Sequence, residues 1–349
     1  MSEIAGLATA LPPHVITLEE TKTQVAAHIE DPAARARFQR MVDESRIAKR
    51  HLVVPPARAL TLRTIEERQH EYARHVVDLG EVVARRALTS ARIDAGSIGT
   101  VISVSCTGYM LPSLEVHLAH RIGLSPAARR VPITELGCLA SVAAVGLARE
   151  LLASQNDGRV LIVSTELPSL CLQTSEPATS DVIGGILFGD AAAAVVITAD
   201  GDGRGIRILG SRTVLWPETT SDLGMRLTTT GFRLDLSRHV PRLIRRHLRA
   251  TVDAFLGQHE ATVSDVSFWA IHPGGPRVVE AIAEALELSD TALRASWDVW
   301  QRCGNVSSAS VLLVLQELLD SDTPAAGSLG MLLAPGPGLS CEMVLLRAP

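Results

Sequence analysis

Short apolar runs and longer amphipathic runs alternate along most of this chain. The apolar runs are rich in Val, Ile, Leu and Ala and short enough to be buried strands; they occupy residues 100–106, 159–165, 191–198, 266–272, 328–334 and 341–346. The amphipathic runs have helical spacing; they occupy residues 78–91, 113–123, 138–155, 242–259, 276–288 and 307–322. Strands that alternate with helices in this way predict a layered α/β structure.

Two stretches of the chain resemble each other. "GCLASVAAVGLARELLASQ", from Gly137, aligns without a gap with "GNVSSASVLLVLQELLDSD", from Gly304, and a strand-like run follows each. Upstream, "TVISVSCTG" faces "VSFWAIHPGG". Chance similarity between two amphipathic helices is the alternative. The repeated order of strand, loop, glycine and helix favours an internal duplication, which we expect to divide the chain into halves at 1–205 and 206–349.

The same alignment brings three chemically useful side chains into relation. Cys138 stands opposite Asn305, each at the start of a predicted helix, and His272 ends the strand that corresponds to residues 100–106. In a pseudo-symmetric pair of sheets these positions can meet near the axis, and covalent acyl transfer needs a thiolate, an imidazole and an amide donor. The structural alternatives are a buried cysteine, a core histidine and a helix N-cap asparagine.

Composition excludes several other kinds of protein. The 349 residues suffice for two packed halves, and a net charge of −5 with no long basic block argues against nucleic acid as the main partner. We find no signal peptide and no apolar run long enough to span a membrane. Five widely spaced cysteines without a CxxC pair argue against a disulfide framework and against a metal site. A reducing cytoplasm is therefore the expected location.

Five motifs, in this order, carry a family resemblance that extends over nearly the whole chain. They are "ELGCLASVAAVGLARELL", "ILFGDAAAAVV", "WAIHPGGPRVVEAI", "CGNVSSASVLLVLQEL" and "APGPGLSCEMVLL". Together they resemble the type III polyketide synthases, the chalcone synthase-like enzymes. The resemblance implies the thiolase fold, a duplicated α/β unit with five layers in the order α-β-α-β-α, and a homodimer.

The resemblance also implies a mechanism. Cys138 matches the nucleophile that carries the starter acyl group, and we expect the helix N-terminus and an imidazolium to favour its thiolate. His272 and Asn305 match the residues that stabilise the enolate formed when malonyl-CoA loses carbon dioxide. The substrates would be malonyl-CoA and an acyl-CoA starter. No bound cofactor is expected, because CoA itself carries the acyl group.

Further positions match the family's cavity, its subunit contact and its CoA site. Phe188 matches a gatekeeper between the CoA tunnel and the cavity, with a core aromatic as the alternative. Leu111 matches a residue that reaches across the dimer. The remaining cavity matches are Cys106, Cys171, Leu234 and Ser307, with Phe232 close enough to Leu234 to confuse the alignment. Candidate contacts to the CoA phosphates are Arg46, Lys49, Arg50 and Arg277, and a solvated surface charge is the alternative for each.

The identity of the product depends on the cavity. Thiols and aliphatic side chains at the presumed cavity positions, in a chain with 3% aromatic residues, indicate a narrow apolar channel past the nucleophile. This favours a fatty acyl starter and an alkylpyrone or alkylresorcinol product. A tetrahydroxynaphthalene-type synthase that uses malonyl-CoA alone is the main alternative. A ketoacyl synthase III-like single condensation, a non-catalytic scaffold and a cysteine hydrolase are further alternatives.

Overall fold

The computed structural model describes the whole chain except residues 1, 30, 155–157, 172–183, 200 and 202. Its first group of sheet strands has the order β5-β4-β6-β7-β1. These strands are β1 (Glu3–Ala10), β4 (Thr100–Val104), β5 (Arg129–Ile133), β6 (Arg159–Glu166) and β7 (Ala191–Thr198). A second group continues in the order β8-β13-β12-β11. It consists of β8 (Ile206–Leu215), β11 (Val266–Ile271), β12 (Leu329–Gly336) and β13 (Ser340–Arg347).

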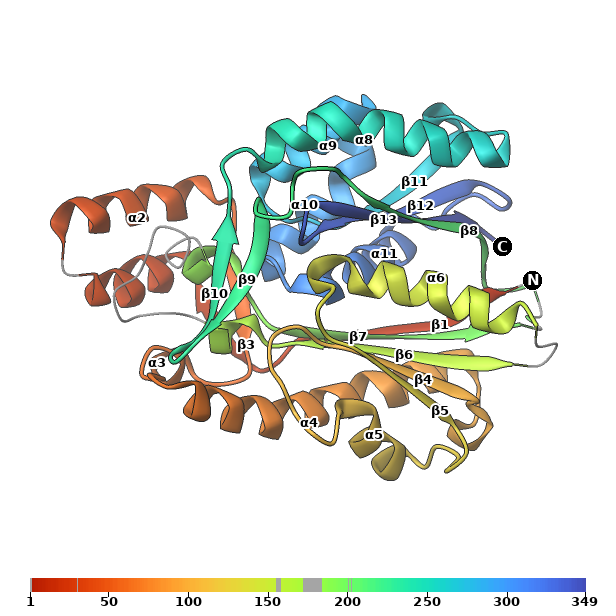
Figure 1. Ribbon diagram of the computed structural model, residues 1–349, viewed down its shortest axis with the longest axis horizontal. Helices are drawn as coiled ribbons and strands as arrows, with labels where there is room; N and C mark the ends of the chain where they lie inside the picture. The colour runs from red at the N-terminus through yellow and green to blue at the C-terminus, as the bar shows by residue number, and fades with distance from the viewer. Residues whose placement is uncertain (1, 30, 155–157, 172–183, 200, 202) are drawn as a thin grey trace.

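The two groups of strands are stacked, with helices outside and between them (Figure 1). Within the described residues they join where Glu3 and Ile4 of β1 pair with Arg207 and Ile206 of β8, beside a bond from the N–H of Ile208 to the carbonyl of Ser2. The helices α4 (Ile65–Ala91) and α5 (Leu114–Ile122) cover one outer face, and α8 (Val240–Leu256) and α9 (Pro276–Leu286) cover the other. The helices α6 (Ala140–Leu152) and α11 (Ser310–Ser321) lie between the sheets. The expected five-layer α-β-α-β-α thiolase fold is confirmed.

Side-chain alternation along the strands explains this layering. On β7, Ala193 and Val195 face the central helices, whereas Ala194 and Val196 face α4. On β13, Val344 faces the central helices and its neighbours face α8 and α9. Because both faces of each sheet are covered by helices, every residue of β7 is buried. This is why the strands appear in the sequence as continuous apolar runs.

The internal repeat is present, but the gapless alignment is wrong by three residues. The turn η4 (Gly137–Leu139) leads into α6, and the turn η8 (Ser307–Ala309) leads into α11 in the same way. Gly137 and Ser307 share a positive φ, of 62° and 51°. Ser308, not Asn305, is therefore the counterpart of Cys138. The apolar pattern of the two helices is similar at several registers, so the sequence alone does not define which residues correspond. The sequence alignment was therefore placed three residues out of register.

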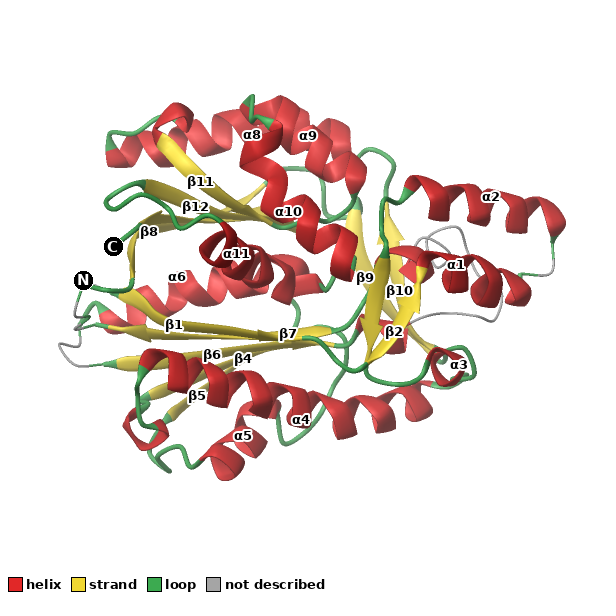
Figure 2. Ribbon diagram, turned by 180° about the vertical axis from the view of Figure 1, so that it is seen from behind, coloured by secondary structure: helices red, strands yellow, loops and turns green. Residues whose placement is uncertain are grey.

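Several further elements lie toward the end of the sheets next to β9 and β10 (Figure 2). They are β2 (His14–Thr17), β3 (Lys49–Leu52), α1 (Leu18–Glu20), α2 (Pro32–Glu44), α3 (Pro56–Ala59), α10 (Asp290–Cys303) and the hairpin of β9 (Leu223–Thr228) and β10 (Gly231–Leu236). The sequence patterns did not predict the hairpin. They predicted that α4 begins at residue 78, whereas it begins at Ile65. No helix in the described part of the chain is both long and apolar enough to cross a membrane.

Candidate active site

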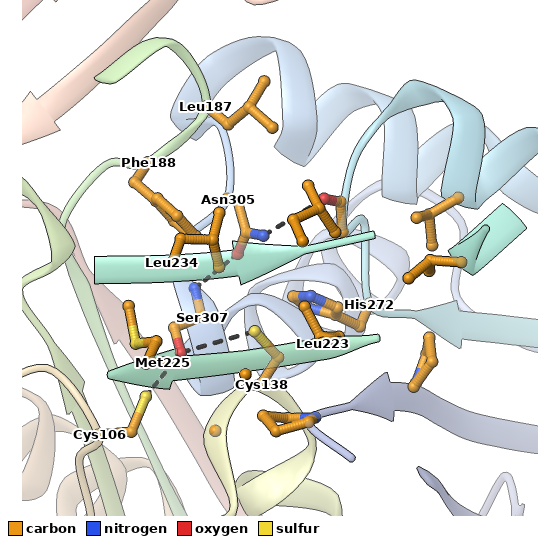
Figure 3. Close-up of a pocket in the computed structure, with 18 of the residues that line it drawn as sticks. Cys106, Cys138, Leu187, Phe188, Leu223, Met225, Leu234, His272, Asn305 and Ser307 are labelled. Carbon is orange, nitrogen blue, oxygen red and sulfur yellow. Dashed lines mark hydrogen bonds between the residues drawn. The ribbon is translucent and has the colours of Figure 1, made fainter. Parts of the chain in front are cut away.

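A mostly apolar pocket opens where the two sheets and the β9–β10 hairpin meet (Figure 3). Counting the part open to solvent, it has an empty volume of about 850 Å³. Cys138, His272 and Asn305 all line it, although they come from η4, from the end of β11 and from the loop before η8. The fold thus brings together the three residues that the sequence suggested for acyl transfer.

The Cys138 turn is held by close packing. Gly137 has φ +62°, and a Cβ there would lie 2.5 Å from Cγ of Pro337. Only glycine fits both the backbone and the space. The Cys138 thiol lies 3.8 Å from the hydroxyl of Ser307, and that hydroxyl lies 3.2 Å from the thiol of Cys106.

Asn305 is oriented by its own loop. Its Oδ1 accepts a hydrogen bond of 2.8 Å from the backbone N–H of Ser307, and its Nδ2 donates a longer one, of 3.4 Å, to the carbonyl of Gly274. The first bond closes an Asx-type turn; the N-cap of η8 is Val306 and carries no side-chain bond, so the N-cap alternative for Asn305 is wrong. Because Nδ2 carries two hydrogens, one of them is left for a ligand in the pocket.

His272 is fixed through its backbone and not through its ring. Its N–H donates to the carbonyl of Leu333, and its carbonyl accepts from Gly274. The side chain is 2% exposed, and among the described residues Nδ1 has no hydrogen-bond partner. No neighbouring group therefore dictates the tautomer of the imidazole.

Burial, more than any charge, decides protonation in this pocket. It raises the pKa of Cys138 to about 12, which the Ser307 hydrogen bond opposes only in part. Burial also lowers the pKa of His272 to about 4. Burial in the site without substrate therefore works against the expected thiolate paired with an imidazolium. At neutral pH the pair is a thiol and a neutral imidazole, because a desolvated pocket disfavours both charges.

A buried carboxyl group lies behind the thiols. Glu166, at the end of β6, accepts hydrogen bonds from Thr107 Oγ1 at 2.9 Å and from the backbone N–H of Cys106 at 3.1 Å. Ser308 Oγ also donates to it, and the Ser307 hydroxyl lies 3.4 Å away. Burial raises the pKa of Glu166. No sequence pattern pointed to Glu166, since a glutamate at the end of a strand gives no distinctive signal.

Phe188 and Leu234 also line the pocket, and Figure 3 shows them beside Asn305. Phe232, the alternative to Leu234, is not among the lining residues. The backbone of Phe188 is held by Arg50, whose Nη1 donates to the carbonyls of Gly185 at 2.7 Å and Phe188 at 2.9 Å. Arg50 is 5% exposed, so the expectation that it grips a CoA phosphate does not agree with its position.

The other candidates lie outside the pocket lining. Cys171 packs behind it, with its thiol 3.5 Å from the carbonyl of Thr107. Arg46 forms an ion pair of 3.2 Å with Glu280 and stacks over Trp297, and its side chain remains 56% exposed. The side chains of Lys49, Arg277 and Leu111 are exposed. Among the described residues no cluster of His, Cys, Asp or Glu could hold a metal ion.

The hairpin supplies a wall that the sequence analysis did not anticipate. Leu223, Met225 and Leu236 line the pocket together with Leu234, and Met225 pairs with Leu234 across the two strands. In Figure 3 one of these strands passes by Asn305 and the other passes by Cys138. The period-two alternation of "LGMRLT" and "GFRLDL" around a glycine-containing turn could have predicted this hairpin.

Comparison with known proteins agrees with this geometry. The family described as chalcone and stilbene synthases, N-terminal domain, matches residues 2–201, and the corresponding C-terminal domain matches residues 208–349. A 1,3,6,8-tetrahydroxynaphthalene synthase of Streptomyces peucetius subsp. caesius is 35% identical over 99% of this chain and 93% of its own length. The alpha-pyrone synthesis polyketide synthase-like Pks18 of Mycobacterium tuberculosis is 31% identical over 98% of this chain and 90% of its own length.

A solved structure extends the similarity to three dimensions. The tetrahydroxynaphthalene synthase of Streptomyces coelicolor A3(2), a bacterial type III polyketide synthase, superposes with a TM-score of 0.95 at 32% identity, over 99% of both chains. The chain belongs to the chalcone and stilbene synthase family. It is a type III polyketide synthase, an acyl-transferring condensing enzyme that uses CoA thioesters.

Proposed function

We propose that Cys138 is the nucleophile and that His272 serves as its base. The thiol proton passes to the imidazole as the sulfur attacks the acyl carbon of the starter thioester. The CoA sulfur then leaves and takes up that proton, so the acyl group ends on Cys138 and CoA departs as a thiol. The resting thiol and neutral imidazole support this order of steps, because a neutral imidazole can accept a proton.

His272 and Asn305 then act on malonyl-CoA. When carbon dioxide leaves, the thioester carbonyl oxygen takes negative charge, and the free Nδ2 hydrogen of Asn305 and an N–H of His272 stabilise it. One such donor is typically worth about 3 kcal/mol of barrier. The carbanion attacks the acyl carbon of the Cys138 thioester, and the bond from that carbon to the Cys138 sulfur breaks. The chain, now two carbons longer, is held on CoA, and the sulfur leaves as a thiolate that takes a proton to regenerate the thiol.

We propose that the starter is an aliphatic acyl-CoA. Cyclisation of the extended chain then yields an alkylpyrone or an alkylresorcinol. The apolar lining of the pocket carries this proposal: Leu223, Met225, Leu234, Val240 and Ile244 face it, and among the described residues no Asp, Glu, Lys or Arg lines it. Each buried methylene contributes about 0.8 kcal/mol, so six extra methylenes favour loading by several kcal/mol. The relative named for alpha-pyrone synthesis is consistent with this choice.

The test is a series of acyl-CoA starters from acetyl to dodecanoyl with labelled malonyl-CoA, analysed by mass spectrometry. We expect kcat/KM to rise at least to decanoyl-CoA. We also expect Leu234→Phe to move the optimum to shorter chains, because its ring would fill space in front of the nucleophile. If the enzyme works best with malonyl-CoA alone and kcat/KM does not depend on the length of the acyl starter, this assignment is refuted.

A tetrahydroxynaphthalene-type reaction from malonyl-CoA alone is the second candidate. It is favoured by the relative of that name at 35% identity and by the structural match. The same experiment distinguishes the two, since this reaction needs only malonyl-CoA and releases an aromatic product with no alkyl chain.

We further propose a homodimer in the cytoplasm. Leu111 is 83% exposed and its neighbour Tyr109 is 68% exposed. Apolar side chains exposed together to this degree are typical of an interface. Arg46, Lys49 and Arg277 remain the proposed contacts to the CoA phosphates.

A further inference from the structure

The helix α8 and the turn before it carry a row of arginines at the surface. Residues 237–252 contain five arginines and no acidic residue, in a chain whose net charge is −5. The apolar side of α8, which includes Ile244, is buried against the second sheet. Arg242 and Arg246 are exposed and one turn apart, and at about 100° per residue they lie on the side of the helix opposite Ile244.

Ion pairs within the chain use only part of this positive charge. Arg245 pairs with Glu284, and Arg249 pairs with Glu287 at 3.5 Å, so both arginines connect α8 to the neighbouring helix α9 (Figure 1). Three further arginines are exposed and form no ion pair in the described part of the chain: Arg238, Arg242 and Arg246. Their charge remains available to a partner outside this chain.

The row of arginines begins beside an opening of the active-site pocket. Leu236 lines the pocket and is 38% exposed, so the pocket reaches the surface at this residue. Arg238 follows two residues later in the chain. Val240 and Ile244 of α8 line the same pocket from within the protein. A partner bound to the outer side of α8 therefore lies next to the pocket that contains Cys138.

Charge and chemistry together indicate the kind of partner. A helix that lies on a membrane inserts its apolar side into the lipid, but the apolar side of α8 is buried within the protein. An acidic protein needs no apolar side, since complementary charge can steer and orient it. The enzyme acts on acyl thioesters of CoA, and the phosphopantetheine arm of a carrier protein presents the same thioester.

We infer that Arg238, Arg242 and Arg246 dock an acidic carrier protein, which delivers an acyl group to Cys138 on its phosphopantetheine arm. The Cys138 sulfur attacks the acyl carbon, and the bond from that carbon to the sulfur of the arm breaks. The arm leaves as a thiol and takes the proton that Cys138 gave up. The inference rests on the proposed nucleophile. It does not depend on which starter the enzyme prefers, because the acyl-enzyme is the same as from acyl-CoA.

The test reverses the charge of the two arginines on the helix itself, Arg242→Glu with Arg246→Glu. Both side chains are exposed, and residue 242 lies in the first turn of α8, where a negative charge favours the helix. Arg347→Glu is the matched control. Arg347 is exposed at the last residue of β13, whereas Ser340, the first residue of that strand, lies at the end nearer the pocket.

The donors are a bacterial fatty-acid-synthase carrier protein, CoA and free pantetheine. Each is loaded with the acyl group that the wild-type enzyme uses best on CoA. The readout is kcat/KM for acylation of Cys138, followed by mass spectrometry. In the double variant we expect at least a tenfold loss with the carrier protein, and values within twofold of wild type with CoA and pantetheine. Arg347→Glu should change none of the three. The wild-type value with the carrier protein should also fall severalfold between about 50 mM and about 300 mM salt, because salt screens exposed charges.

Three results would overturn the inference. They are no transfer from the carrier protein to the wild-type enzyme, transfer that the double variant leaves unchanged, and an equal loss with acyl-CoA. If transfer is unchanged but the double variant no longer binds phosphatidylglycerol vesicles, the arginines serve a membrane surface and the inference is also wrong. Failure of acyl-CoA itself to acylate Cys138 in the wild-type enzyme would instead refute the proposed nucleophile.

Discussion

The protonation of Cys138 can be tested by replacing its presumed partner. Burial is the largest cause of the raised pKa of Cys138, and the charge of Glu166 adds to it. Relative to a free cysteine with a pKa of about 8.5, this disfavours the thiolate by about 5 kcal/mol. With a pKa of about 12, roughly one thiol in 10⁵ is ionised at pH 7. An unperturbed cysteine with a pKa of about 8.5 is ionised to a few per cent, about 3,000-fold more.

Alkylation by iodoacetamide measures this fraction, because only the thiolate reacts. The rate at Cys138, followed by mass spectrometry of its peptide, should rise about tenfold per pH unit from pH 6 to 10 without a plateau. At pH 7 it should be about three orders of magnitude below that of a free cysteine peptide. His272→Gln should leave the profile within about twofold of the wild type, since it keeps a similar volume and removes only the imidazole.

The opposite result has a distinct signature. A plateau below pH 8 in the wild-type enzyme, lost or moved upward in His272→Gln, would show an ion pair in the resting site. In that case the electrostatic attraction would outweigh desolvation, and the proposed order of proton transfer would be incorrect.

Four further outcomes are expected. Cys138→Ala should abolish acyl-enzyme and polyketide while retaining decarboxylation of malonyl-CoA; full product in this variant would contradict the mechanism. In light scattering the wild-type enzyme should have the mass of a dimer, whose interface we expect to exceed about 2,000 Å². Leu111→Glu should weaken the dimer, and a stable, active wild-type monomer would argue against the dimer. Gly137→Ala should lose about 2–4 kcal/mol in denaturant unfolding, from a left-handed backbone and a clash with Pro337; equal stability would exclude that strain. Burial raises the pKa of Glu342 to about 7, so its ionisation opposes folding increasingly as pH rises from about 4.5 to about 7. Glu342→Gln should therefore raise Tm at pH 8 but not at pH 4, and an equal gain at both pH values would rule out this titration.

Much of the fold could be predicted because strands that are buried on both faces of a sheet appear in the sequence as continuous apolar runs. The apolar run 191–198 coincides with β7, and the run 266–272 with β11 to within one residue. The half-exposed β9–β10 hairpin has a weaker alternation of apolar and polar residues. The hairpin was therefore not predicted, although it forms a wall of the pocket. The register of the repeat was also predicted incorrectly. Gly137 and Ser307 share a positive φ, but this is a property of the backbone that cannot be deduced from a glycine and a serine in the sequence.

The sequence by itself determined the fold class and the family and pointed to Cys138, His272 and Asn305 as candidates, since local patterns and motif order depend only on the chain. The tertiary structure alone decided the state of these groups. Desolvation depends on what surrounds a side chain, so the neutral thiol and imidazole followed only from packing. The same reason applies to Arg50 and Arg68. Each looks like an ordinary surface charge in the sequence, and only the fold places each guanidinium against buried carbonyls from distant segments.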